Sequence, residues 1–204
     1  MEKQIDCTGL QCPAPVLKTK EVIEHEPVEH IHVKVDNDAA AENVSRFLDY
    51  NGFDVSMDSD GAISTVSGRK NADKVQDQKP LPEAGQQART PDSSKILVMI
   101  TAARIGKGDD ELGGKLMLNF IKTLKEMGSD LWRVVFLNHG VTLCTRGSAH
   151  IDALRALEEE GVSLLVCGAC LDHLGLLDKK EVGQTTNMLD IVTSAQLSDN
   201  IINL

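Results

Sequence analysis

Two cysteine-containing motifs in this chain of 204 residues have the residue types and spacing for chemistry on sulfur. The first is Cys12, in the run Cys12-Pro13-Ala14-Pro15, which precedes an amphipathic segment over 16–26. Because Pro at the first helical position costs no hydrogen bond, the pattern predicts a thiol at a helix N-terminus. The helix dipole and unpaired amides there stabilise a thiolate. We expect the amides facing the sulfur to be those of Ala14, Val16 and Leu17.

The second group is Cys167-Gly168-Ala169-Cys170, directly after an apolar strand predicted over 162–167. Parallel sheets place their sites at the carboxyl ends of strands. This pair could therefore be a redox couple, half of a zinc site or a transfer site. Zinc would need a second ligand pair, and Cys7 with Cys12 is a poor one, so we predict no metal. A thioredoxin-like site is excluded by context, because that motif opens a helix and usually contains Pro.

The other thiols and two histidines have less defined roles. Cys7 could resolve a bond formed on Cys12, but we favour a small buried hydrophobic residue. Cys144 lies in an apparent loop that could approach Cys167, which the sequence leaves open. We interpret His173 as a surface residue, and His139 as one at a strand end near the rim of the site. The candidate catalytic residues are therefore Cys12, Cys167 and Cys170.

Gly106-Lys107-Gly108 follows a predicted strand and invites comparison with a phosphate-binding loop. The segment lacks the spacing of that motif, and the acidic residues after it would repel phosphate. We interpret those residues, Asp109, Asp110 and Glu111, as the cap and charge complement of a helix start. The sequence predicts no cofactor.

Composition limits the classes of function. The net charge of -10 and the pI near 5.0 argue against nucleic-acid binding. The longest apolar runs, 96–100 and 164–167, are too short to cross a membrane, and residues 1–4 do not open a signal peptide. These features predict a cytoplasmic protein. In a reducing compartment, five cysteines favour metal, redox or transfer chemistry over structural disulfides.

The chain divides into two predicted domains. Residues 1–68 show strands and helices in the order βαβαββ, with a hairpin turn at Asp58-Ser59-Asp60-Gly61. This order predicts a two-layer sandwich. Residues 69–94 contain three prolines without apolar periodicity, which indicates a flexible linker. Such a coil would separate its ends by roughly 30 Å on average.

Residues 95–204 alternate apolar strands with helical patterns, which predicts a parallel-sheet α/β domain covered on both faces. The first of its helices, over 109–127, has a predicted core stripe of Leu112, Leu116, Phe120, Leu124 and Met127. The predicted strands are 95–101, 131–137, 162–167 and 200–204, and the other predicted helices are 148–160, capped by Ser148, and 187–196.

The N-terminal motif is recognisable. Asp6-x-x-Gly9-x-x-Cys12-Pro13-x-Pro15, in a short βαβαββ domain, resembles the TusA/SirA family of sulfur carriers. In that family the cysteine carries a persulfide, which it receives from a cysteine desulfurase and passes to another thiol. The resemblance implies this role for Cys12, with a desulfurase or other sulfur donor protein and a downstream thiol acceptor protein as partners.

The C-terminal domain resembles the DsrE family of sulfur-relay proteins. The resemblance rests on Gly108-Asp109-Asp110-Glu111-Leu112-Gly113, on Asn138-His139-Gly140-Val141 and on Cys167-Gly168-Ala169-Cys170-Leu171. It implies a reactive cysteine at the strand end, which Cys167 matches best, and association of copies through this domain. The combination of domains is similar to YedF-type proteins, which are sulfurtransferase-like and linked to selenium metabolism.

The sequence thus predicts a sulfur or selenium relay in which Cys12 carries the persulfide and Cys167, with Cys170, exchanges it. The linker would make that exchange intramolecular. Two alternatives stay open: a redox-sensing or regulatory binding module without catalysis, and a dithiol oxidoreductase on Cys167 and Cys170. No partner that is a nucleic acid or a membrane is expected.

Overall fold

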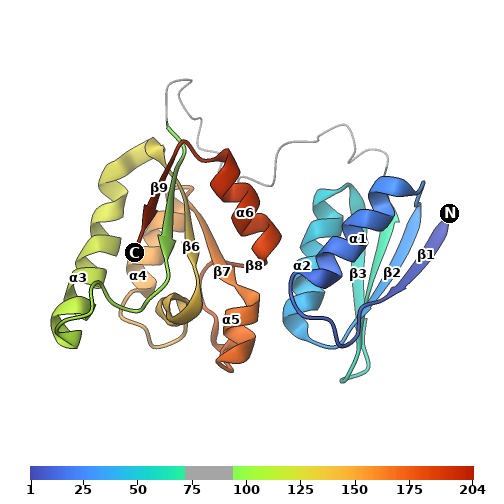
Figure 1. Ribbon diagram of the computed structural model, residues 1–204, viewed down its shortest axis with the longest axis horizontal. Coiled ribbons are helices and arrows are strands. Elements are labelled where there is room, and N and C mark those ends of the chain that lie inside the picture. Colours follow the sequence, from blue (N-terminus) through green and yellow to red (C-terminus); the bar gives the residue numbers. More distant parts are fainter. Residues whose placement is uncertain (72–93) are drawn as a thin grey trace. The chain divides into compact units, whose positions relative to one another are not determined.

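The computed structural model describes residues 1–71 and 94–204, which form two compact units, each built around one β-sheet (Figure 1). Most of the predicted linker, 69–94, lies outside the described residues. Its first two residues, Arg69 and Lys70, belong to the last strand of the N-terminal unit. The domain and linker limits given above stay a prediction.

The N-terminal unit has the predicted order βαβαββ and a four-stranded sheet in the order β1-β2-β4-β3. Strand β1 is parallel to β2, and β4 is antiparallel to both of its neighbours. The elements are β1 (Glu2–Asp6), α1 (Ala14–His25), β2 (His30–Val35), α2 (Asp38–Tyr50), β3 (Phe53–Ser59) and β4 (Ser64–Lys70).

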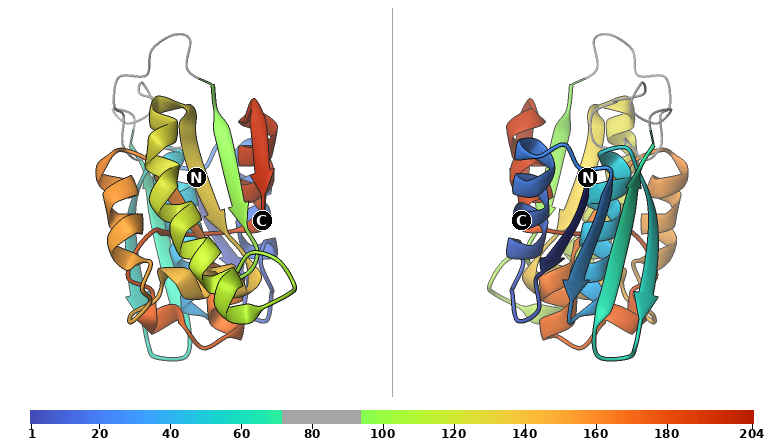
Figure 2. Two further views of the ribbon diagram at one scale, coloured as in Figure 1. Left: turned by 90° about the vertical axis from the view of Figure 1, so that its left-hand side faces the viewer. Right: turned by 90° about the vertical axis from the view of Figure 1, so that its right-hand side faces the viewer.

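Both helices of this unit pack on one face of its sheet, and the right-hand view of Figure 2 looks onto the strands with the helices behind them. Strand β2 shows why, because Ile31, Val33 and Val35 are fully buried while the residues between them point to the other face. The Asn37 side chain caps α2 by accepting a hydrogen bond from the Ala40 amide at 2.8 Å. The buried core is aliphatic apart from Phe53 and Cys7.

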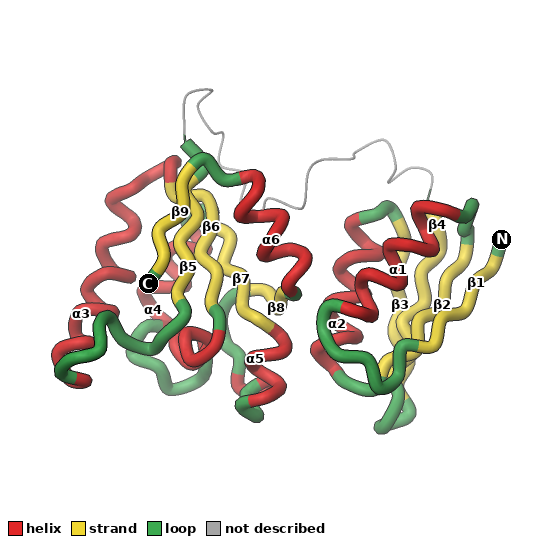
Figure 3. The backbone as a smooth tube through the Cα atoms, viewed as in Figure 1, coloured by secondary structure: helices red, strands yellow, loops and turns green. Residues whose placement is uncertain are grey.

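The C-terminal unit contains a five-stranded sheet in the order β8-β7-β6-β5-β9 (Figure 3). Every pairing between its strands is parallel. This confirms the predicted parallel α/β fold. Its strands are β5 (Ile96–Ile100), β6 (Leu131–Phe136), β7 (Ser163–Cys167), β8 (Gln184–Thr186) and β9 (Asn200–Asn203). Its α-helices are α3 (Asp110–Thr123), α4 (Ile151–Glu159), α5 (Gly168–His173) and α6 (Met188–Leu197), and its 3₁₀ helices are η2 (Leu124–Asp130), η3 (Asn138–Cys144) and η4 (Leu177–Lys179).

The central strands of this sheet are covered on both faces, as predicted. Val98, Val134 and Leu164 belong to one core cluster with the buried side chains of α3 and α4. Their neighbours along the strands, such as Leu97 and Val135, form a second cluster with Ile191 of α6 on the opposite face. In Figure 1 α3 and α4 accordingly lie on one side of the sheet and α6 on the other.

The core stripe predicted over 109–127 was wrong in its first two residues, whereas Leu124 is buried and Phe120 and Met127 pack against the core. Leu112 and Leu116 are 55% and 43% exposed, and the helix buries Gly113, Met117 and Ile121 instead. The physical reason is the close approach of the preceding loop, where the Ile105 amide donates to the Gly113 carbonyl at 3.1 Å. Only a residue without a side chain fits that approach. The helical pattern also ends earlier than predicted, because residues 124–130 form η2.

Other boundaries differ more modestly. Helix α4 begins at Ile151 rather than at Ser148, whose hydroxyl instead accepts from the His150 amide at 3.3 Å. The sequence analysis did not predict β8 or α5, which are three and six residues long. Elements this short carry no periodic signal. The predicted capping acids are confirmed, because Asp109 accepts from the Leu112 amide at 2.7 Å and Asp110 pairs with Arg104.

The two adjacent glycines of α3 should respond to alanine in opposite directions. A Cβ at Gly113 would lie 2.8 Å from the Ile105 carbonyl oxygen, whereas a Cβ at Gly114 meets nothing within 4 Å. We expect Gly113→Ala to lower the free energy of unfolding by about 1–3 kcal/mol through overpacking. Gly114→Ala should raise it by about 0.5–1 kcal/mol, because alanine is the better helix former.

Urea unfolding followed by the fluorescence of the single tryptophan, Trp132 in β6, measures both values in this unit. The same sign of change in both variants would contradict the packing described for α3.

Candidate thiol sites

Cys12 is partly exposed in the loop that joins β1 to α1, two residues before the helix begins. Pro13 is the N-cap residue of α1, so the predicted position of the thiol at a helix N-terminus is confirmed. The loop thus presents a sulfur next to the amino end of a helix of 12 residues. An accessible thiol in this position is suited to nucleophilic attack.

Two carboxylates shape the loop that carries Cys12. Asp6 accepts hydrogen bonds from the Thr8 amide at 2.9 Å and from the Thr8 hydroxyl at 2.7 Å. These two bonds, the amide more than the hydroxyl, hold the pKa of Asp6 below its ordinary value. Gly9 has a positive φ of 73° and donates its amide to Asp36 at 2.5 Å. The sequence analysis did not identify Asp36, because it lies after β2 and reaches the loop only through the fold.

Not all of the backbone amides predicted to face the Cys12 sulfur are free to donate a hydrogen bond to it. The Ala14 amide donates to the Gln11 carbonyl at 2.9 Å, and the Leu17 amide donates to the Pro13 carbonyl at 3.1 Å. Two of the three amides predicted to face the sulfur are therefore used within the backbone. The setting of Cys12 is an exposed loop joined to a helix, rather than a pocket of free donors.

Cys7 is fully buried in the core of the same unit, as favoured from the sequence. Its amide donates to the Lys34 carbonyl at 2.8 Å, which extends the pairing of β1 with β2 by one residue. Burial raises the pKa of its thiol. Cys7 therefore remains protonated at neutral pH and has a structural role.

Cys167 and Cys170 lie in direct contact at the carboxyl edge of the C-terminal sheet. Cys167 is the last residue of β7, and Cys170 lies one turn later in α5. The Cys170 thiol donates to the Cys167 sulfur at a distance of 2.8 Å between the two Sγ atoms. Cys167 is only 4% exposed, whereas Cys170 is partly exposed.

A third group completes this site, and the sequence analysis did not assign it. The backbone N–H of Asn138, at the start of η3, donates to the Cys170 sulfur at 3.2 Å. Asn138 has a left-handed backbone with φ of 47°, a conformation that asparagine tolerates better than most residues. Strands β6 and β7 are neighbours, so the residues after β6 reach the cysteines after β7.

The remaining predicted residues divide by burial. Cys144 is fully buried in the same core cluster as Cys167, and burial, with a smaller effect of Glu158, raises the pKa of its thiol well above 9.0. His139 is exposed next to the site, with its ring bonded to the Asn138 side chain at 3.0 Å. His173 is exposed at the last turn of α5, as predicted.

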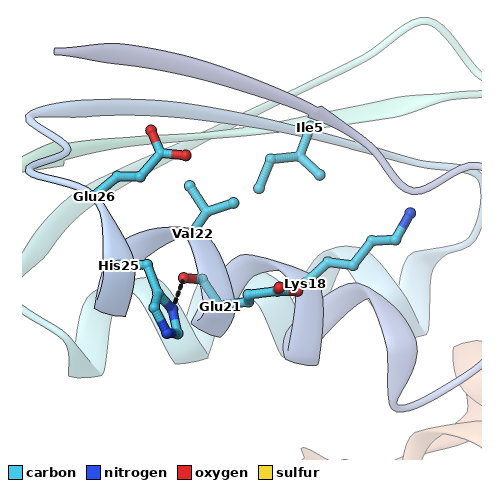
Figure 4. Close-up of a pocket in the computed structure, with 6 residues that line it drawn as sticks. All are labelled: Ile5, Lys18, Glu21, Val22, His25 and Glu26. Carbon is cyan, nitrogen blue, oxygen red and sulfur yellow. Dashed lines mark hydrogen bonds between the residues drawn. The ribbon is translucent and has the colours of Figure 1, made fainter.

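A shallow hollow of about 340 Å³ lies between α1 and β1, and no cysteine lines it (Figure 4). It is lined by Ile5, Lys18, Glu21, Val22, His25 and Glu26, and the His25 ring is bonded to the Glu21 carbonyl at 2.9 Å. Within residues 1–71 and 94–204, no group of three His, Cys, Asp or Glu side chains is placed to hold a metal ion. No helix in those two ranges is long and apolar enough to cross a membrane.

Comparison with known proteins matches each unit to a family. The model of the family described as Sulfurtransferase TusA matches residues 3–69, and that of the DsrE/DsrF-like family matches residues 95–204. A relative from Methanocaldococcus jannaschii, provisionally described as a sulfur carrier protein, is 44% identical over 54 residues. That match covers 26% of this chain and 72% of the relative.

Two solved structures are similar to parts of the chain. The ychN protein of E. coli is 18% identical with a TM-score of 0.45, and the match covers 54% of this chain and 99% of that protein. A SirA-like protein from Desulfitobacterium hafniense is 24% identical with a TM-score of 0.31, covering 33% of this chain and 95% of that protein.

The two sheets define a two-domain α/β protein, and each domain matches a different family model. The chain belongs to the DsrE/DsrF-like family through residues 95–204 and to the TusA family of sulfur carriers through residues 3–69. The predicted resemblances to the TusA/SirA and DsrE families are therefore confirmed. Together these matches support a role in sulfur relay, and TusA-like carriers interact with sulfur donors and acceptors.

Burial predicts the order in which the five thiols react. In the native protein we expect iodoacetamide to label Cys12 and Cys170 first, since both are partly exposed. Cys7 and Cys144 should react at least roughly 100-fold more slowly, because the reagent reaches them only after local opening of the structure. Peptide mapping by mass spectrometry measures each site, with a urea-unfolded sample as the control in which all five react. Labelling of Cys7 or Cys144 as fast as Cys12 would contradict the burial described.

The raised pKa of Cys144 predicts a loss of stability at alkaline pH. In the unfolded chain the thiol ionises around its ordinary pKa of 9.0, whereas the buried thiol keeps its proton. Rising pH above that value therefore favours the unfolded state by about 1.4 kcal/mol per pH unit. Cys144→Ala should lack this part of the slope.

The measurement is urea unfolding of both proteins by Trp132 fluorescence at roughly pH 8, 9 and 10. Cys12→Ala, a change in the other unit, is the control and should follow the wild type. A constant difference between wild type and Cys144→Ala across this range would show that the thiol is not protected by burial.

Proposed function

We propose that the chain is a sulfur-relay protein in which Cys12 carries a persulfide between a donor protein and an acceptor thiol. The observation that carries this proposal is the position of Cys12, which is partly exposed just before α1 on the unit that matches the sulfur carriers. The other thiol of that unit, Cys7, is buried. One sulfur is therefore offered to partners.

The reaction proposed for Cys12 is exchange at sulfur. The Cys12 thiolate attacks the outer sulfur of a persulfide on the donor, the donor's thiolate leaves, and the bound sulfur is then attacked by the next thiol. A cysteine desulfurase is the donor that the family resemblance implies. Selenium in place of the outer sulfur would use the same thiol.

The C-terminal pair is the proposed second station. Cys167 and Cys170 lie in contact at a sheet edge, and Cys170 is open enough for an incoming persulfide. Transfer from Cys12 to this pair would be intramolecular and favoured by effective concentration. The proposed setting is the cytoplasm, where thiols stay reduced.

The proposal predicts a persulfide on Cys12. After incubation with a cysteine desulfurase and cysteine, the Cys167→Ser/Cys170→Ser protein, which keeps the N-terminal thiol but removes the second station, should gain about 32 Da. Cys12→Ser added to this background should remove the gain. Intact-mass spectrometry measures both, and peptide mapping places the adduct.

Cys7→Ala in the same background is the matched control and should keep the adduct, because Cys7 is buried. A protein that gains no sulfur with Cys12 intact overturns the proposal. That result would favour the alternative of a redox-sensing or regulatory module that carries no sulfur.

A further inference from the structure

The two cysteines of the C-terminal site differ in access. Cys170 is partly exposed, whereas Cys167 is 4% exposed and lies in the main core cluster with side chains such as Phe136 and Val166. A bulky donor persulfide therefore meets Cys170 first. The sequence resemblance favoured Cys167 as the match to the reactive position, whereas the difference in access favours Cys170 as the first acceptor.

The buried sulfur is placed to act on the exposed one. The Sγ atoms of Cys167 and Cys170 lie 2.8 Å apart, and a disulfide bond is about 2.04 Å long, so closure requires an approach of less than about 1 Å. The Asn138 N–H, at 3.2 Å, holds the Cys170 sulfur from another segment. Cys170 is thus fixed between a backbone donor and a second thiol.

A persulfide on Cys170 would present two sulfurs to attack, and the geometry selects one of them. The outer sulfur extends away from Cys170, whereas the inner sulfur is the Sγ atom that Cys167 already contacts. Attack on the outer sulfur would only move the persulfide to the buried side chain. Attack on the inner sulfur forms a disulfide and expels the outer sulfur.

We propose that the Cys167–Cys170 pair is a release site, at which Cys170 accepts sulfane sulfur and Cys167 displaces it as hydrogen sulfide. The S–S bond between Cys167 and Cys170 forms as the bond from Cys170 to the outer sulfur breaks. The proton of the Cys167 thiol balances the hydrosulfide that leaves. The two cysteines are oxidised to a disulfide and the outer sulfur is reduced to sulfide. The inference rests on the proposed function, because sulfane sulfur must reach the C-terminal unit before Cys170 can accept it.

Repeated turnover requires a dithiol reductant, which returns the Cys167–Cys170 disulfide to two thiols and is itself oxidised to a disulfide. With the reductant absent, the site turns over once. A single turnover therefore isolates the proposed step. The same sequence with selenium as the outer atom would release hydrogen selenide.

The test uses the full chain with Cys12→Ser, so that neither Cys12 nor a desulfurase is needed. Anaerobic incubation with cysteine persulfide that carries a heavy isotope in its outer sulfur should release about one equivalent of labelled sulfide per chain. The protein should lose about 2 Da and contain no label. Peptide mapping should find the disulfide between Cys167 and Cys170.

Two variants separate the roles of the cysteines. Cys12→Ser/Cys167→Ser should keep the labelled sulfur on Cys170 and release sulfide at least roughly 10-fold more slowly, since the attacking thiol is missing. Cys12→Ser/Cys170→Ser should neither hold label on Cys167 nor release sulfide, because Cys167 is buried. The protein with all three residues changed to Ser sets the background, and Trp132 fluorescence verifies that each variant is folded.

Three results would overturn the release site: label that stays on the protein while Cys167 is present, a labelled adduct on Cys167, or equal sulfide release without Cys167. A fourth result, no reaction at Cys170 at all, would overturn it as well. Cys12 is absent from every protein in this test. A failure of the release site is therefore distinct from a failure of Cys12 to accept sulfur from a desulfurase.

Discussion

Both thiol sites depend on one constraint: the chain leaves a parallel strand and enters a helix directly beside the reactive sulfur. Strand β1 is parallel to β2 and leads through the loop of Cys12 into α1. Strand β7 is parallel to both of its neighbours and ends at Cys167, from which α5 continues. Parallel strands require crossover connections, and the segments that follow the strands gather at the carboxyl ends of the sheet. The position of each sulfur therefore follows from strand direction before any side chain is considered.

The two units stabilise this junction by different means. In the N-terminal unit the loop is long, and side-chain carboxylates of Asp6 and Asp36 hold its amides. In the C-terminal unit there is no intervening loop, and the site is held by the hydrophobic core below Cys167 and by the Asn138 amide above Cys170. The first arrangement exposes one sulfur at the surface. The second brings two sulfurs into contact, one exposed and one buried.

The sequence predicted those parts of the molecule that repeat or that carry distinctive residue types. Strand alternation in β2 and the continuous apolar runs of β5 and β7 predicted both sheets, and Cys12 before two prolines predicted its helix end. The buried face at the start of α3 was missed because Leu112 and Leu116 are the more apolar choice, while the deciding contact is the fit of Gly113 against a loop. The Asn138 donor was missed for a different reason. Its functional group is a backbone amide, which every residue except proline has, so only the register of β6 beside β7 identifies it.

The position of the second thiol in each unit distinguishes a carrier from a release site. A persulfide lasts only while no second thiol can attack its inner sulfur, so the neighbours of each cysteine decide its fate. In the N-terminal unit Cys7 is fully buried, with its pKa raised by burial and its amide fixed to β2, so it is a poor attacking group for a sulfur held on Cys12. In the C-terminal unit Cys167 already contacts the sulfur of Cys170. On the proposed chemistry, sulfur bound to Cys12 would persist until an acceptor arrives, whereas sulfur that reaches Cys170 would leave as sulfide. One chain would then combine a station that keeps sulfane sulfur with a station that discharges it.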